Sequence, residues 1–194
     1  MTTSDIQDYL EKNKYFEAKE ANKYGISNER LHLLEEQGKI ERVDHGIYVG
    51  SHQEIDMLYV YQRRRNIIYS HETALYLHDL TDRDPLNYSV SVSRGYNSRK
   101  LKELGFDVYY VKKELYQLGE IEIETIFGNK VKVYSMERTL CDIVRSQSRM
   151  DKSVIIDAFK TYSHRKNKDL HTLMDLAKRF KVTNQIKQYL EVLL

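Results

Sequence analysis

The sequence contains a single cysteine, a single proline and no tryptophan among its 194 residues. Cys141 alone cannot form a disulfide within the chain, and a chain without disulfides is typical of a reducing compartment. No apolar run approaches the roughly 20 residues that a membrane-spanning helix needs. The first residues also lack the basic and apolar regions of a secretory signal. We therefore expect a cytoplasmic protein.

Glycine and proline are too scarce for a flexible linker, because the chain has 8 Gly and 1 Pro. Residues 1–50 carry 7 Lys or Arg against 10 Asp or Glu, a net charge of −3, and the remainder carries 24 against 19, or +5. The pattern of elements changes after Gly50. We predict one domain over residues 1–50 and a second over 51–194, which is β-rich at 67–134 and helical at 135–194.

The spacing of apolar residues predicts three short helices, over residues 4–13, 16–24 and 28–37. Gly25 and Gly38 are suitable residues to end the second and third of these helices. The second and third helices are joined by a tight turn that contains glycine, which is the pattern of a helix-turn-helix.

Two short strands follow the third helix. Residues 39–43 and 47–49 alternate between polar and apolar side chains around a turn that contains Gly46. Three helices followed by a β-hairpin predict a winged helix-turn-helix DNA-binding domain over residues 1–50.

The third helix and the hairpin carry the candidate DNA contacts. Leu31 and Leu34 are expected to pack on the first two helices, which turns the opposite face outward to read bases, while the hairpin faces phosphates or a minor groove. The predicted reading residues are Ser27, Asn28, Arg30 and His32, and the predicted wing contacts are Lys39, Arg42 and His45. The alternative is a solvated face used for protein contacts, because Glu35 and Glu36 would repel a DNA backbone.

A basic cluster follows the first domain. A helix predicted over residues 53–66 ends in Arg63, Arg64 and Arg65. Cations at a helix C-terminus are favoured by the helix dipole alone. The functional alternative is a phosphate-contacting patch beside the wing, which would offset the acidity of residues 1–50.

A second basic segment, residues 94–100, is polar and interleaved with tyrosine. It is either a solvated loop or a contact to a nucleic-acid backbone through Arg94, Arg99 and Lys100.

The fold class predicted for the whole chain is α+β. Residues 51–194 are expected to form a mixed α/β domain with a small antiparallel sheet and a helical C-terminus. The expected strands are 67–69, 88–92, 108–111 and a hairpin over 121–134 with a three-residue loop at 128–130. The expected helices are one that Ser70 caps and those over 135–147, 152–163, 169–180 and 183–193. The hairpin places Ile121, Ile123 and Phe127 on the same side as Val131 and Val133.

No catalytic motif is complete. His71 and Glu72 begin a zinc-protease pattern, but the second histidine is missing. Glu122 and Glu124 near Lys132 could suggest a nuclease metal site, but their pattern favours a cross-strand ion ladder on a solvated sheet face. We expect no enzyme activity, no cofactor and no metal site.

The sequence resembles the AbiEi-type antitoxins of bacterial type IV, abortive-infection toxin–antitoxin systems. Residues 16–48 resemble the N-terminal domain of that family. Residues 70–75 (Ser-His-Glu-Thr-Ala-Leu) and 134–142 (Tyr-Ser-Met-Glu-Arg-Thr-Leu-Cys-Asp) resemble two stretches of its C-terminal domain. The candidate motif residues of the second domain are Ser70, His71, Glu72, Glu137, Arg138 and Asp142. A structural role also explains the second stretch, with Ser135 capping a helix and Arg138 paired to Asp142 one turn later.

The resemblance implies two functions. One is autorepression, in which the winged domain binds inverted repeats in double-stranded promoter DNA. The other is counteraction of a nucleotidyltransferase-like toxin without a stable complex. The alternative from another class is a nucleic-acid-processing enzyme with a winged targeting domain.

Overall fold

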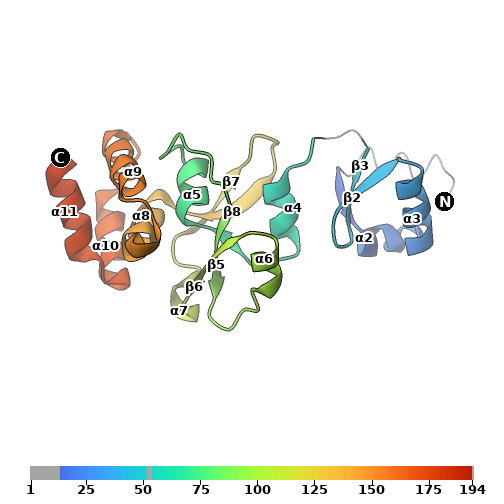
Figure 1. Ribbon diagram of the computed structural model, residues 1–194, viewed down its shortest axis with the longest axis horizontal. Coiled ribbons are helices and arrows are strands. Elements are labelled where there is room, and N and C mark those ends of the chain that lie inside the picture. The colour runs from blue at the N-terminus through green and yellow to red at the C-terminus, as the bar shows by residue number, and fades with distance from the viewer. Residues whose placement is uncertain (1–13, 52–53, 194) are drawn as a thin grey trace. The chain divides into compact units, whose positions relative to one another are not determined.

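The computed structural model describes residues 14–51 and 54–193. The predicted helix over residues 4–13 and the start of the one over 53–66 lie outside the described residues. The chain divides into two compact units, which are residues 1–65 with 126–129 and residues 66–125 with 130–194. The division lies after Arg65, later in the chain than the boundary expected after Gly50. Figure 1 labels the elements of both units.

The first unit combines short helices with a three-stranded antiparallel sheet of order β1-β3-β2. Its elements are β1 (Tyr15–Glu17), α2 (Ala18–Lys23), α3 (Asn28–Glu36), β2 (Ile40–Asp44), β3 (Ile47–Gly50) and α4 (Met57–Arg63). The turn between α2 and α3 contains Gly25 at φ +80°. The helix-turn-helix and the hairpin predicted after it are therefore both present.

The start of the second helix was predicted wrongly. Phe16 lies on β1, where it is opposite Tyr48 of β3, and the two rings stack at 5.7 Å. Helix α2 begins only at Ala18, after a capping box in which Glu17 and Glu20 exchange hydrogen bonds with each other's backbone. Strand pairing with a segment far along the chain thus outweighs the local helical pattern around Phe16.

The second unit is built on a five-stranded mixed sheet of order β6-β5-β4-β8-β7. Its strands are β4 (Ile68–Tyr69), β5 (Ser89–Ser93), β6 (Asp107–Val111), β7 (Glu120–Glu124) and β8 (Lys130–Tyr134). The pairs β5–β6 and β4–β8 are parallel, whereas the sequence favoured a small antiparallel sheet. In the β5–β6 pair, the parallel direction is made possible by an unpredicted helix, α6 (Arg99–Glu103), which connects the two strands as a crossover.

The hairpin of β7 and β8 keeps the predicted apolar alignment with a different loop. Ile121 is opposite Val133, and Ile123 is opposite Val131. The loop extends over residues 125–129, so Phe127 is not on the strand as predicted.

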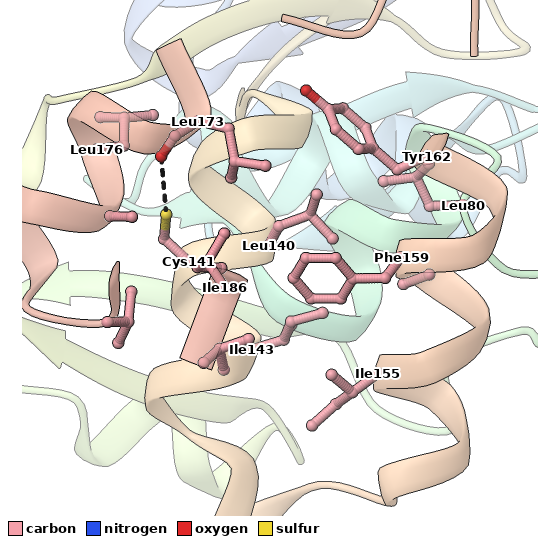
Figure 2. Close-up of a cluster of buried hydrophobic side chains, with 14 of the residues drawn as sticks. Leu80, Leu140, Cys141, Ile143, Ile155, Phe159, Tyr162, Leu173, Leu176 and Ile186 are labelled. Carbon is pink, nitrogen blue, oxygen red and sulfur yellow. Dashed lines mark hydrogen bonds between the residues drawn. The ribbon is translucent and has the colours of Figure 1, made fainter. Parts of the chain in front are cut away.

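The α+β class and the helical C-terminus are confirmed. The helices of the second unit, besides α6, are α5 (His71–Leu77), α7 (Lys113–Tyr116), α8 (Met136–Arg145), the 3-10 turn η1 (Gln147–Arg149), α9 (Lys152–His164), α10 (Leu170–Phe180) and α11 (Thr183–Leu193). Helices α8 to α11 enclose the largest apolar core, drawn in Figure 2. Within the described residues, no helix is long and apolar enough to cross a membrane.

Cys141 lies in this core, as the sequence predicted. Its thiol is buried and donates to the Leu173 carbonyl at 3.9 Å (Figure 2). Burial raises the pKa of the Cys141 thiol to about 12. Because the thiolate is the nucleophile that attacks thiol reagents, Cys141 should be inert in the native chain and become reactive when the helical core opens.

We predict that Phe159→Ala lowers the free energy of unfolding of this core by about 3–5 kcal/mol, because Phe159 is fully buried among its side chains. The measurement is the urea dependence of Cys141 labelling at mildly alkaline pH. Ile156→Ala on the same helix is the control, because Ile156 is 48% exposed. Rapid labelling of the native chain would contradict this description of the core.

Candidate nucleic-acid interface

Helix α3 presents a polar outer face. Leu31 and Leu34 are buried, as predicted, while Asn28 and His32 are exposed. Asn28 accepts a hydrogen bond from Asn22 of α2 at 3.3 Å, and His32 lies 3.4 Å from Glu36. The face of α3 that carries Asn28 and His32 is therefore open to a ligand, and His32 lies beside the Glu36 carboxylate.

Two of the predicted reading residues have local structural contacts. Ser27 is the N-cap of α3, and its hydroxyl accepts the backbone N–H of Arg30 at 3.2 Å. The Arg30 side chain is half-buried. Ser27 therefore fixes where α3 begins, which positions Asn28 and Arg30 at the exposed N-terminal end of the helix.

The tip of the wing is an organised cluster of cations. Arg42 Nη2 lies 3.0 Å from His45 Nδ1. Because a guanidinium only donates, His45 Nδ1 is the acceptor of this contact. Arg64 donates to the His45 carbonyl and lies against Gly46, whose φ is +67°. Arg42, His45 and Arg64 are all exposed, as is Lys39 before the wing.

The three consecutive arginines do not form one patch. Arg63 binds Glu20 at 2.9 Å, and Arg65 binds Asp44 at 2.5 Å. Arg63 also lies 3.7 Å from Glu17. All of these residues belong to the first unit, so the expectation that the second domain supplies Arg63 to Arg65 is wrong. Only Arg64 of the three is exposed.

These pairs compensate part of the acidity of the first unit. Residues 1–65 contain 10 Lys or Arg, which are the 7 of residues 1–50 plus Arg63 to Arg65, and 12 Asp or Glu. The carboxylates of Glu17, Glu20 and Asp44 face arginines within the unit. Their negative charge is therefore compensated locally, which leaves the exposed wing cations to act on a ligand.

Asp44 fixes the turn at the tip of the wing. Its carboxylate accepts the backbone N–H of His45 at 2.7 Å and both terminal nitrogens of Arg65. Partial burial acts to raise the pKa of Asp44, but the hydrogen bonds from Arg65 and His45 outweigh it and the pKa is lowered. Asp44 is therefore ionised at neutral pH, and its carboxylate holds the turn by binding the His45 amide and the Arg65 guanidinium.

The second basic segment lies entirely in the second unit. Residues 94–98 form the connection after β5, while Arg99 and Lys100 begin α6 instead of continuing a loop. Arg94, Arg99 and Lys100 are exposed, and Arg99 pairs with Glu103 at 2.8 Å. These three residues remain a predicted nucleic-acid contact.

The first motif stretch of the second unit is mostly buried. His71 is fully buried at φ +47°, with Nδ1 3.0 Å from the Ser70 hydroxyl and Nε2 3.0 Å from the Ser146 hydroxyl. Its ring stacks on Tyr109 at 3.3 Å. Burial, and then the nearby arginines of helix α8 and turn η1, lower the pKa of His71 well below its usual value. His71 is therefore neutral, and only Glu72 of this stretch is half-exposed.

The second motif stretch forms a buried ion pair. Arg138 donates to Asp142 at 2.9 Å, as the spacing predicted, and its guanidinium lies between the rings of Tyr134 and Phe180 at 3.8 and 4.0 Å. Burial raises the pKa of Asp142 against the opposing effect of Arg138 and Arg145.

Glu137, also buried, accepts from the Tyr162 hydroxyl at 2.9 Å. Glu137 thereby joins α8 to α9, and Arg138 donates to the carbonyls of Leu115 and Leu118, while Asp142 holds the Arg138 guanidinium from the same helix. These contacts support the structural interpretation of this stretch.

Several partners of these motif residues were not predicted. Ser146 and Tyr109 contact His71 from helix α8 and strand β6. Arg149 covers the Tyr109 ring at 4.2 Å. Nothing in the local sequence around these residues marks them, because they meet only through the fold. The pair of Asp142 with Arg145 at 3.3 Å is the exception, since its i, i+3 spacing can be read from the sequence.

The hairpin residues that were candidates for a metal site do not come together to form one. Glu122 and Glu124 are exposed on β7, opposite Lys132 and Lys130, and Lys132 pairs with Glu120 at 2.8 Å. In the part of the chain that the structure describes, no group of three His, Cys, Asp or Glu side chains is placed to share a metal ion. The arrangement matches a cross-strand ion ladder.

Residues 4–49 match the model of a family described as a transcriptional regulator, AbiEi antitoxin. The resemblance stated from the sequence is thus confirmed for the segment that carries α2, α3 and the wing. The match does not extend into the second unit. No curated protein matches the chain.

We predict that Arg65→Ala loosens the wing, because it leaves the partly buried Asp44 carboxylate without its cation. The expected loss of stability of the first unit is about 1–3 kcal/mol. Amide hydrogen exchange measures it locally, and the His45 amide should lose protection. Arg64→Ala is the matched control, because that side chain is exposed and should cost less than about 1 kcal/mol. Equal protection in both variants would contradict the assigned role of Arg65.

We predict that the second unit loses stability as the pH falls below about 6.5, the pKa of histidine in the unfolded chain. The unfolded state then binds a proton that the buried, neutral His71 does not bind, so stability falls by up to about 1.4 kcal/mol per pH unit. Urea unfolding from about pH 7.5 to 5.5 measures the slope.

His71→Asn should reduce that slope, because asparagine tolerates a positive φ and does not titrate. His171→Asn is the control in the same unit, because the His171 side chain is 89% exposed. The same slope in wild type and His71→Asn would show that His71 is not the buried neutral group described.

Proposed function

We propose that the chain is a DNA-binding autorepressor and antitoxin of a bacterial toxin–antitoxin operon. The observation that carries the proposal is the geometry of residues 27–45. An exposed recognition helix and a wing with fixed cations lie in the segment that matches an antitoxin and transcriptional-regulator family. We further propose that it acts in the cytoplasm, without enzyme activity of its own.

The recognition helix and the wing have separate tasks. The N-terminal end of α3 enters the major groove, where Asn28 suits adenine and Arg30 suits guanine through paired hydrogen bonds. Arg42, His45 and Lys39 lie on or beside the wing, and as cations or hydrogen-bond donors they contact phosphates or the minor groove. Arg64, which lies against the turn of the wing, adds a further cation from outside the family match.

The acidic residues do not oppose this arrangement. Glu35 and Glu36 lie at the C-terminal end of α3, away from the end that reads bases. Glu17, Glu20 and Asp44 face arginines within the unit. The remaining positive groups can therefore hold a duplex without a strongly basic domain.

The finer biological role rests on the resemblance. Autorepression through inverted repeats requires two copies of the winged unit on one site, one for each half-site. The second unit is proposed to counter a nucleotidyltransferase-like toxin without a stable complex. Its motif residues would act by maintaining the fold of that unit, because all except Glu72 are buried.

We predict that Arg42→Ala weakens binding to a duplex from upstream of its own gene, with a salt slope smaller by about 1, because one phosphate contact is lost for every sequence alike. Asn28→Ala should instead reduce discrimination at one base pair by about 1–3 kcal/mol. Fluorescence anisotropy over a salt series, with single-base variants of the duplex, measures both effects.

Lys166→Ala is the control, because Lys166 is exposed and lies outside the first unit. It should bind the duplex as wild type does. Unchanged affinity and specificity in Arg42→Ala, Asn28→Ala and Arg30→Ala together would contradict the helix-and-wing assignment. Coexpression with the neighbouring toxin tests the antitoxin function separately, and Arg42→Ala should still protect the cell.

A further inference from the structure

The second unit contains a hollow of about 590 Å³ beside the second basic segment. It is lined by Tyr96, Asn97, Ser98, Arg99, Lys102, Glu103 and Tyr110. This volume lies in the range of small-molecule sites. The proposed promoter binding makes no use of it.

The hollow lies where open α/β sheets place their ligands. Strands β5 and β6 are parallel, and α6 connects them. Residues 94–98 leave the carboxyl end of β5, and Tyr110 lies one residue before the carboxyl end of β6, beside Val92. Ligands of such sheets bind outside the carboxyl ends of parallel strands. The position of the hollow is thus a second observation, independent of its residue types.

Two tyrosines give the hollow an aromatic surface. Tyr110 is 44% exposed although it lies on a strand of the sheet. Its hydroxyl is hydrogen-bonded to the buried Ser98, which holds the ring in place. Tyr96 lines the same hollow. A fixed and exposed aromatic ring is a platform on which a nucleic-acid base can stack.

The charges around the rings favour an anion. Lys102 Nζ lies 6.0 Å from the centre of the Tyr110 ring. Arg99 is neutralised by Glu103, so Lys102 is the cation of the lining that remains for a ligand. The exposed Arg94 and Lys100 both precede it in the sequence. Asn97 offers an amide that can donate and accept.

A second hollow in the same unit has the opposite character. It measures about 670 Å³ and is lined by three carboxylates, Asp79, Asp82 and Asp157, and by no tyrosine or phenylalanine side chain. Its cations, among them Lys160, lie among those carboxylates. Tyrosine rings beside an available cation therefore distinguish the hollow at β5 and β6 from this second hollow.

We propose that this hollow binds one nucleotide, with the base stacked on Tyr110 and the phosphate held by Lys102. An exposed ring can receive an unstacked base, whereas the bases of a duplex are stacked inside it and out of reach. The nucleotide is either free or part of a single strand. If the ligand is a strand, Arg94 and Lys100 contact its next phosphates. The nucleic acid predicted to contact this segment is then single-stranded.

The test titrates the full chain with adenosine, adenosine 5′-monophosphate and a short oligodeoxythymidylate, followed by calorimetry. Tyr110→Ala should weaken all three ligands by about tenfold or more, because one stacked base is lost. Lys102→Ala should weaken the monophosphate and the oligonucleotide but leave adenosine unchanged. Tyr110→Phe keeps the ring and should bind bases nearly as wild type does. Lys160→Ala, in the acidic hollow, is the matched control and should bind as wild type.

The same titrations distinguish a free nucleotide from a nucleotide of a single strand. Tighter binding of the oligonucleotide than of the monophosphate, reduced by Arg94→Ala, supports a single strand as the ligand. Equal binding, unaffected by Arg94→Ala, supports a free nucleotide. The absence of binding by all three ligands would overturn the proposal, as would equal affinities in wild type, Tyr110→Ala and Lys102→Ala.

The proposal does not depend on promoter binding. Arg42→Ala should bind the monophosphate as wild type does, and Tyr110→Ala should bind the promoter duplex as wild type does. Failure of one function with retention of the other would therefore identify which of the two proposals is wrong. Thermal unfolding of each variant shows that a lost affinity does not result from a lost fold.

Discussion

The ion pair between Arg65 and Asp44 determines both the shape of the wing and the charge that it presents. Asp44 holds the His45 amide while it is bound by Arg65, so the turn is fixed from within the unit. Arg63 does the same for the start of α2 through Glu20. Because these carboxylates are compensated internally, a domain with a formal excess of acid still presents cations at its wing. Two of the three arginines that look like a DNA-binding patch in the sequence are instead engaged within the first unit, where they support the proposed interface.

The second unit uses buried polar groups in a comparable way. Arg138 and Glu137 link α8 to the surrounding elements, and Asp142 pairs with Arg138 on the same helix. His71 is enclosed by hydroxyl groups and an aromatic ring. Removing one partner of such a cluster leaves a buried charge or donor without compensation, which costs more than the contact itself contributes. The motif residues therefore stabilise the fold of the unit. They do not by themselves indicate chemistry at its surface.

The local features of the molecule could be predicted from the sequence, and the non-local ones could not. The cap at Ser27, the buried Leu31 and Leu34, the hairpin, the C-terminal helices and the pairing of Arg138 with Asp142 all follow from short spacings. Phe16 was assigned to a helix because its strand partner lies in β3. The pairs of Arg65 with Asp44 and of Arg63 with Glu20 join residues 21 and 43 positions apart, and no local pattern marks them. The parallel strands were missed because α6 is short and polar, and the hollow that it helps to form was missed with it.

Amide chemical-shift mapping of the isotopically labelled chain, titrated with a duplex from upstream of its own gene, tests the account most directly. If α3 and the wing form the interface, the largest changes will fall on residues 27–32 and 39–46, with the side chain of Arg64 also affected. The amides around Arg63 and Arg65 will change less, because those side chains keep their partners within the unit. Changes confined to the second unit, or spread evenly over the exposed cations of both units, would contradict the account.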